Sequence, residues 1–171
     1  GKSGPRFIRP IRWMVALLGS EVVEFEIAGV KSGNVTTGHR RLGKNKICVS
    51  IANYEDKLKE NFVLIDALER RRKIESEIPV RIKPDPELLD TLVNLTEYPA
   101  PIVGDFDPQF LGLPEEVLVT VMRHHQKYFS VVNEDGSLAP SFVAVMNTSA
   151  DPDGLVRRGN ERVLRARFND A

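Results

Sequence analysis

The sequence predicts an α+β fold in which helices pack against a mixed sheet. Two observations support this prediction. Segments with apolar residues at helical spacing are interspersed with short β-branched segments, and two of the latter are joined by a turn, as in a hairpin. No repeat or low-complexity segment interrupts the pattern. At 171 residues the chain is long enough for one substantial core.

The first part of the chain predicts one helix followed by extended segments and loops. A proline suits the first turn of a helix over about residues 10–18, and Gly19 would end it. Apolar and acidic residues then alternate within 22–27, which indicates a half-buried strand. Glycines punctuate residues 31–44, so we expect a surface loop with a short extended piece there, before a strand over 46–52.

Three helices are predicted in the middle of the chain. Asn53 can cap the first, which runs to about residue 60. The second spans about 66–76 and ends before Pro79. In the third, apolar residues within 88–95 recur at i, i+3, i+4 and i+7, the spacing of an amphipathic helix.

The second half predicts a short strand, a helix and a hairpin. Prolines place the strand over 101–104 at an edge or a strand start. The helix over about 114–126 begins with a proline and has two acidic residues in its first turn, which the helix dipole favours. The hairpin consists of strands over 128–132 and 141–146, joined by a turn at 133–136.

The last predicted element is a basic helix that begins at about Asn160. We divide the chain into an α+β core domain, residues 1–153, and a terminal segment, residues 154–171, which leads into the next module. The chain begins with Gly and this helix has no terminating signal, so we expect a piece of a longer protein.

Composition restricts the class of protein. Lys and Arg number 24, as do Asp and Glu, so no net charge draws the molecule to nucleic acid, and any RNA contact needs a local patch. No apolar run approaches a membrane span, and no signal peptide is recognisable. Cys48, the single cysteine, lies in an apolar run and is expected to be a buried structural thiol. A cytoplasmic protein without disulfides fits these features.

Sequence signatures of enzymes are absent. The chain has no glycine-rich dinucleotide motif, complete phosphate loop, Cys-x-x-Cys pair or His-Glu-x-x-His motif. His124 and His125 are neighbours on a predicted helix, where their side chains point about 100° apart and converge poorly on one ion. We therefore predict no catalytic residue, no metal ligand and no cofactor in this chain.

A basic and aromatic group ends the predicted helix 114–126. Arg123 and Lys127 are four residues apart, and Tyr128 follows directly. Cationic groups neutralise phosphates and aromatic rings stack on bases, so these residues suit RNA. The alternative is that the cations stabilise the helix C-terminus. His125, beside the apolar face, is either a half-buried structural histidine or an RNA contact.

Arginines are concentrated near the end of the chain, at five positions between Arg157 and Arg167. On a helix, Arg162 and Arg165 share one face. We expect them either to bind phosphate or to form salt bridges to neighbouring domains. The run of four cations at 70–73 points in every direction around its helix and is interpreted as a solvated face.

Five segments in this order resemble one family: residues 6–13, 38–43, 113–118, 122–129 and 159–167. They are similar to the beta subunit of the bacterial two-subunit glycine-tRNA ligase, and the resemblance covers almost the whole chain. Arg12, Arg41 and His124 depart from the pattern, which puts a catalytic role for Arg12 and His124 in doubt.

The resemblance implies an internal fragment of a heterotetrameric ligase. In that family the alpha subunit activates glycine with ATP and Mg²⁺, and the beta subunit helps to bind and place tRNA(Gly). It also implies a fold similar to the editing-type domain of the phenylalanine-tRNA ligase beta subunit, without transferring editing activity.

From the resemblance we expect a noncatalytic region that engages tRNA and acts as a scaffold. Its partners would be the alpha subunit, tRNA(Gly) and the remaining beta-subunit domains. The expected tRNA contacts are Arg123, His125, Lys127, Tyr128, Arg162 and Arg165. The alternatives are a purely structural interaction module and an editing-like hydrolytic domain.

Overall fold

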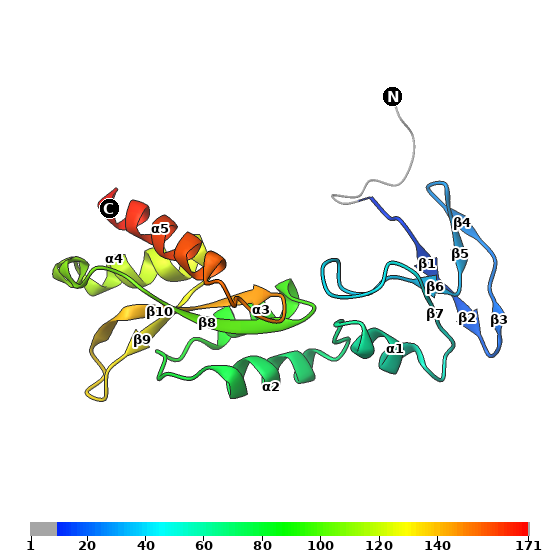
Figure 1. Ribbon diagram of the computed structural model, residues 1–171, viewed down its shortest axis with the longest axis horizontal. Helices are drawn as coiled ribbons and strands as arrows, with labels where there is room; N and C mark the ends of the chain where they lie inside the picture. The colour runs from blue at the N-terminus through cyan, green and yellow to red at the C-terminus, as the bar shows by residue number, and fades with distance from the viewer. Residues whose placement is uncertain (1–9, 171) are drawn as a thin grey trace, which may run out of the picture. The chain divides into compact units, whose positions relative to one another are not determined.

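The computed structural model describes residues 10–170, which form two compact units (Figure 1). The boundary lies between Ile65 and Asp66, not at residue 153. The second unit includes the C-terminal helix because Leu164 and Phe168 are buried in its core. Whether this helix also leads into a further module stays a prediction.

The first unit is built from short strands and one helix. Its elements are β1 (Met14–Val15), β2 (Leu17–Leu18), β3 (Glu21–Val22), β4 (Glu26–Ile27), β5 (Val30–Gly33), β6 (Val35–Thr36), β7 (Ile47–Cys48) and α1 (Tyr54–Glu60). β5 pairs in parallel with β1 and antiparallel with β4. β2 pairs with β3, and β6 pairs with β7, both antiparallel.

The predicted helix over residues 10–18 is wrong. Apolar residues occupy every position from Trp13 to Leu18, so the segment has no polar side and suits extended chain as well as helix. Tertiary pairing decides between them: Leu18 pairs with Glu21 across a tight turn. Gly19 adopts a φ of +61° in this turn, a conformation that glycine tolerates best.

Cys48 is exposed, so the prediction of a buried thiol is also wrong. Ile47 and Val49 are buried on either side of it. Side chains alternate between the two faces of a strand, and the apolar run therefore points Cys48 outward.

The second unit has helices on both faces of an antiparallel sheet with the strand order β8, β10, β9 (Figure 1). The helices α2 and α3 pack on one face, and α4, the π-helix η2 and α5 pack on the other. The bounds are α2 (Ala67–Glu77), α3 (Pro86–Leu95), β8 (Pro99–Asp105), the 3-10 helix η1 (Pro108–Gly112), α4 (Glu115–Thr120), η2 (Val121–Gln126), β9 (Phe129–Val132), β10 (Leu138–Asn147) and α5 (Leu155–Asn169).

Successive side chains of β10 point to opposite faces of the sheet, and each face has its own hydrophobic core. Phe142 and Ala144 face Leu118 and Met122 of the helical layer that contains α5, whereas Val143 faces the α2 and α3 layer. The second core contains Ile74, Leu88, Leu92, Val93, Phe129, Val131, Ala139 and Val143.

The predicted helices of the middle segment, the edge strand and the hairpin are confirmed. The predicted helix 114–126 is present as α4 continuing into η2. The last helix begins at Leu155 instead of Asn160. Asp151 accounts for the earlier start, because its carboxylate accepts hydrogen bonds from the backbone N–H groups of Val156 and Arg157 at 3.1 and 2.9 Å.

Gly104 provides a test of the sheet packing. It is paired with Phe142, and a Cβ at this position would lie 2.4 Å from the Phe142 ring. We expect Gly104→Ala to destabilise the fold by about 1–3 kcal/mol, since the ring is fully buried and cannot move aside. Urea unfolding measures this loss. Gly112→Ala is the control because nothing lies within 4 Å of its added Cβ, and equal midpoints for both variants would contradict the packing argument.

Candidate nucleic-acid interface

An exposed arginine face runs along α5. Leu164 and Phe168 anchor the helix, and the Phe168 ring lies 5.1 Å from the Phe106 ring and 5.4 Å from that of Phe110. Arg158, Arg162 and Arg165 follow one another at i, i+4 and i+7 on another side of the helix, and all three are exposed. We call these three residues the arginine face.

The arginine face is largely free of carboxylates within residues 10–170, apart from an electrostatic interaction of Arg158 with Asp151 that helps to lower the pKa of Asp151. None of its members forms an ion pair there, and the acidic residue within α5 is engaged elsewhere. Glu161 lies 3.6 Å from Arg157, and its carboxylate accepts a hydrogen bond from the Asp105 N–H at 3.2 Å. The guanidinium groups of Arg162 and Arg165 therefore remain available for an external anion.

The start of α5 fixes the position of this face. Gly154 has a φ of +62°, and the Asp151 carboxylate binds the first N–H groups of the helix. The hydrogen bond from the Arg157 N–H is the main reason that the pKa of Asp151 lies below its ordinary value. Residue Arg158 was missed as a site residue because a start at Asn160 leaves it outside the helix. The available sequence signal was Asp151, an acidic residue four positions before the apolar pair Leu155 and Val156.

Arg123 is a structural cation. Its Nε donates to Asp85 Oδ2 at 2.5 Å, and its Nη2 donates to Glu87 Oε2 at 2.6 Å. Asp85 also caps α3 by accepting from the Leu88 N–H at 2.9 Å. Burial opposes ionisation of Asp85, but the hydrogen bonds from Arg123 and Leu88 hold its pKa below the ordinary value. Arg123 thus ties η2 to the first turn of α3.

Because Arg123 and Asp85 form an ion pair, we expect the free energy of unfolding to depend on pH. An Asp with a lowered folded pKa stabilises the fold above its unfolded pKa, about 3.9, and this contribution disappears as pH falls through the folded pKa. We expect Asp85→Asn, which can still cap α3, to be less stable than wild type at pH 7 and to approach wild type near pH 3. Urea unfolding at both pH values tests this. Asp107→Asn is a capping control, since Asp107 pairs with no described cation, and a gap that persists at low pH would contradict the assignment.

Tyr128 lies in the core, so the predicted basic and aromatic cluster does not form a single surface. Tyr128 is 8% exposed, and its ring stacks on Phe142 with a centroid separation of 4.7 Å. Burial raises the pKa of Tyr128 to about 12. Lys127 precedes it with a φ of +62°, which turns the chain from η2 into β9. A ring in this position cannot stack on a base.

His125 and Lys127 are exposed on the helical layer that contains α5. His125 is thus more exposed than the half-buried position expected of a structural histidine. The Lys127 ammonium donates to the His124 carbonyl at 3.3 Å. The structure therefore brings Arg162 and Arg165 together with Arg158, and leaves His125 and Lys127 as accessible side chains in the same layer.

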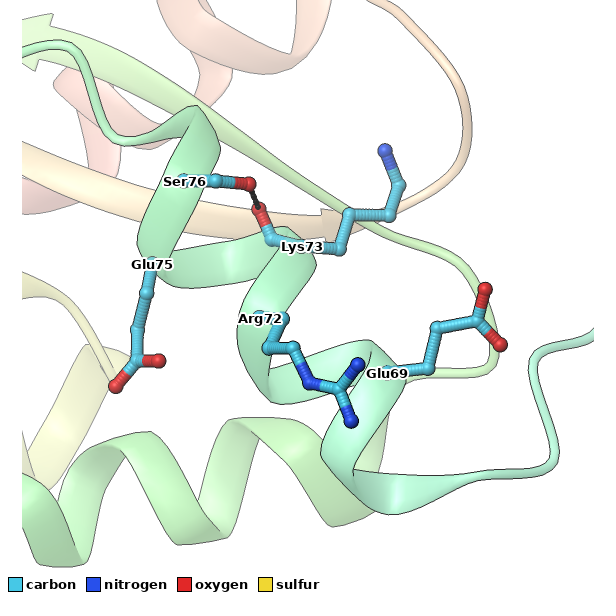
Figure 2. A pocket seen from close by; sticks show the side chains of 5 residues that line it. All are labelled: Glu69, Arg72, Lys73, Glu75 and Ser76. Carbon is cyan, nitrogen blue, oxygen red and sulfur yellow. Dashed lines mark hydrogen bonds between the residues drawn. The ribbon is translucent and has the colours of Figure 1, made fainter.

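Two surface depressions lack the features of an active site. One is lined by α2 residues: Glu69, Arg72, Lys73, Glu75 and Ser76 (Figure 2). Figure 2 shows Glu69 and Glu75 pointing in different directions, so they do not converge on one substrate atom. The other depression contains Arg123 and Asp85, already paired, and Lys83, which is 2.7 Å from Glu115.

Residues 10–170 contain neither a metal-binding cluster nor a membrane-spanning helix. No group of three or more His, Cys, Asp or Glu side chains there is arranged to hold a metal ion. None of the helices in that range has the length and apolar character needed to cross a membrane.

Comparison with known proteins identifies the family. The sequence model described as "Glycyl-tRNA synthetase beta subunit" matches residues 1–171. The chain belongs to the glycyl-tRNA synthetase beta subunit family. It is 44% identical to the glycine–tRNA ligase beta subunit of Listeria welshimeri over 178 residues, which cover 100% of this chain and 26% of the relative.

Other beta subunits agree with this assignment. The Moorella thermoacetica protein is 47% identical over 97% of this chain and 25% of its own length. The Bacillus subtilis protein is 43% identical over 100% of this chain and 26% of its own length. This member of the glycyl-tRNA synthetase beta subunit family thus spans about a quarter of the curated relatives it matches, and the resemblance seen in the sequence is confirmed.

Proposed function

We propose that this chain is a noncatalytic region that engages tRNA(Gly) and acts as a scaffold in the cytoplasmic attachment of glycine to tRNA. The arginine face of α5 is the observation that carries the proposal. It presents three exposed cations, none of which forms an ion pair within residues 10–170. The relatives are named glycine–tRNA ligase beta subunits, which supplies the substrate class. Arg158, Arg162 and Arg165 contact phosphates, and His125 and Lys127 extend the contact.

The chemical step belongs to the alpha subunit in this proposal. ATP and Mg²⁺ would act there, as the family resemblance implies. This chain contributes to the reaction by binding and positioning the tRNA and by joining the alpha subunit to the remaining beta-subunit domains.

The first test is crosslinking of the 171-residue chain to a glycine tRNA carrying photoreactive groups, with the crosslinked peptides mapped. We expect crosslinks to α5 at low salt and their loss as salt rises, because phosphate contacts release counterions. Crosslinks confined to other elements would contradict the placement on α5.

A purely structural interaction module is the second candidate, and exposed apolar residues on α5 favour it. Leu155, Val156 and Val163 are 65%, 38% and 42% exposed. Such residues beside a charged face can bind another protein domain. A chain that binds the alpha subunit but shows no tRNA gel shift at low salt would support this candidate over RNA binding.

We also propose that the fold of the second unit is similar to the editing-type domain of the phenylalanine-tRNA ligase beta subunit. Helices on both faces of an antiparallel sheet are compatible with it. We assign no hydrolytic activity, because the Asp85 carboxylate, in the depression that also contains Lys83 and Arg123, is already bound to Arg123. Release of an amino acid from mischarged tRNA by this chain would overturn that assignment.

A further inference from the structure

The first unit carries a second cationic surface, in addition to the arginine face of the second unit. No acidic residue occurs between Glu26 and Glu55. That interval contains five Lys and Arg residues, all exposed and none with an ion pair in the described part of the chain: Lys31, Arg40, Arg41, Lys44 and Lys46. Four of them belong to the segment 38–46, which we call the basic loop.

The basic loop has a fixed backbone. His39 is 3% exposed, and its Nδ1 accepts from the N–H groups of Arg41 and Leu42 at 3.2 and 3.3 Å. The Gly43 N–H donates to the His39 carbonyl at 2.8 Å. A buried imidazole therefore holds the backbone around the two exposed arginines, so less conformational entropy is lost when they bind a ligand.

Asn61, after the end of α1, anchors the same loop. Its backbone carbonyl accepts from the His39 N–H at 2.9 Å, and its side-chain Oδ1 accepts from the Lys44 N–H at 3.1 Å. An added Cβ at Gly38 or Gly43 would approach atoms of Asn61 to 2.6 or 2.5 Å. These glycines allow the close contact that fixes the loop.

Trp13 supplies an exposed aromatic surface next to this loop. Its Nε1–H donates to Thr36 Oγ1 at 3.1 Å, and Thr36 pairs with Ile47, the residue that follows Lys46. Trp13 is nevertheless 46% exposed. The hydrogen bond positions one edge of the indole, while much of the side chain remains accessible.

We propose that Trp13 and the basic loop form a second RNA-binding surface, which takes unpaired nucleotides. The four loop cations neutralise phosphates and the indole stacks on a base, the combination used for single-stranded nucleic acid. This inference deepens the proposed function, since its ligand is also RNA, but it rests on different residues in a different unit. An acidic protein would account for the cations and leave the exposed indole without a role.

The test uses the fluorescence of Trp13, the only tryptophan in the chain. We expect an oligouridylate of about ten nucleotides to quench it, with an affinity that falls as salt rises. R40Q/R41Q should weaken binding about tenfold and lower the salt slope by about 0.7 for each lost phosphate contact. With a labelled oligouridylate, Trp13→Ala should weaken binding about fivefold or more.

K57Q/K59Q on α1 is the matched control, since it removes two positive charges from the same unit outside the basic loop. Equal losses in R40Q/R41Q and this control would overturn the inference. So would unchanged fluorescence at saturating oligouridylate, or equal quenching by polyglutamate, which would assign the surface to an acidic protein.

The variants distinguish a failure of the second RNA-binding surface from a failure of the proposed contact on α5. If R162Q/R165Q abolishes oligouridylate binding and R40Q/R41Q does not, the arginine face stands and the second surface is refuted. The reverse pattern supports the second surface, and the contact on α5 is then decided separately by tRNA crosslinking.

Discussion

Replacing Arg158, Arg162 and Arg165 together by glutamine is expected to weaken tRNA(Gly) binding by about 10- to 100-fold. Each arginine that neutralises a phosphate releases counterions, so the salt dependence should also flatten, by about 1 in log–log slope for each contact. Fluorescence anisotropy of labelled tRNA over a salt series measures both effects. All three arginines are exposed, so the fold should be retained.

Arg157→Gln is the matched control for this experiment. Arg157 has the same chemistry and lies on the same helix, but it is paired with Glu161 at 3.6 Å. We expect it to change the salt slope far less than the triple variant does. A triple variant with the wild-type slope would show that the arginine face does not contact phosphate, and the apolar side of α5 would then be its functional surface.

The elements of the second unit were predictable because they are long and periodic. Apolar spacing specifies α3, and β10 alternates between Phe142 toward one core and Val143 toward the other. The first unit gave weaker signals, since most of its strands have two residues. A strand of two residues is too short to show an alternating pattern in the sequence. Its position is decided by pairing with another strand, as Leu17 pairs with Val22.

The candidate site was predictable only where one helix face carries it. Arg162 and Arg165 are related by helical spacing and could be grouped from the sequence. Arg123 and Asp85 are 38 residues apart, and no local pattern reveals that they pair. Tyr128 follows an apolar helix and a cation in the sequence, but the positive φ at Lys127 directs the chain into the sheet and buries the ring.

The basic loop escaped prediction for a related reason. Arg40 and Arg41 are visible in the sequence, but a loop rich in glycine is usually flexible. Its order depends on Asn61, which is distant in sequence, and on the buried His39. A histidine between a glycine and two arginines gives no sequence signal that distinguishes an internal hydrogen-bond acceptor from a ligand.

Phe168→Ala is expected to cost about 3–5 kcal/mol of folding free energy, the largest stability effect that we predict. Phe168 is 2% exposed and contacts the rings of Phe106 and Phe110. Its removal leaves a cavity under the last turn of α5, where Leu164 alone would remain of the buried anchors. Urea unfolding measures the loss, and Val163→Ala on the same helix is the control, since Val163 is 42% exposed.

The same variant connects packing with function. If the Phe168 anchor positions the arginine face, Phe168→Ala should also weaken tRNA binding under conditions where the chain stays folded, because α5 then loses order before phosphates are bound. Val163→Ala should leave that affinity unchanged. A folded Phe168→Ala protein with wild-type tRNA affinity would separate the two properties and show that the arginines act without a docked helix.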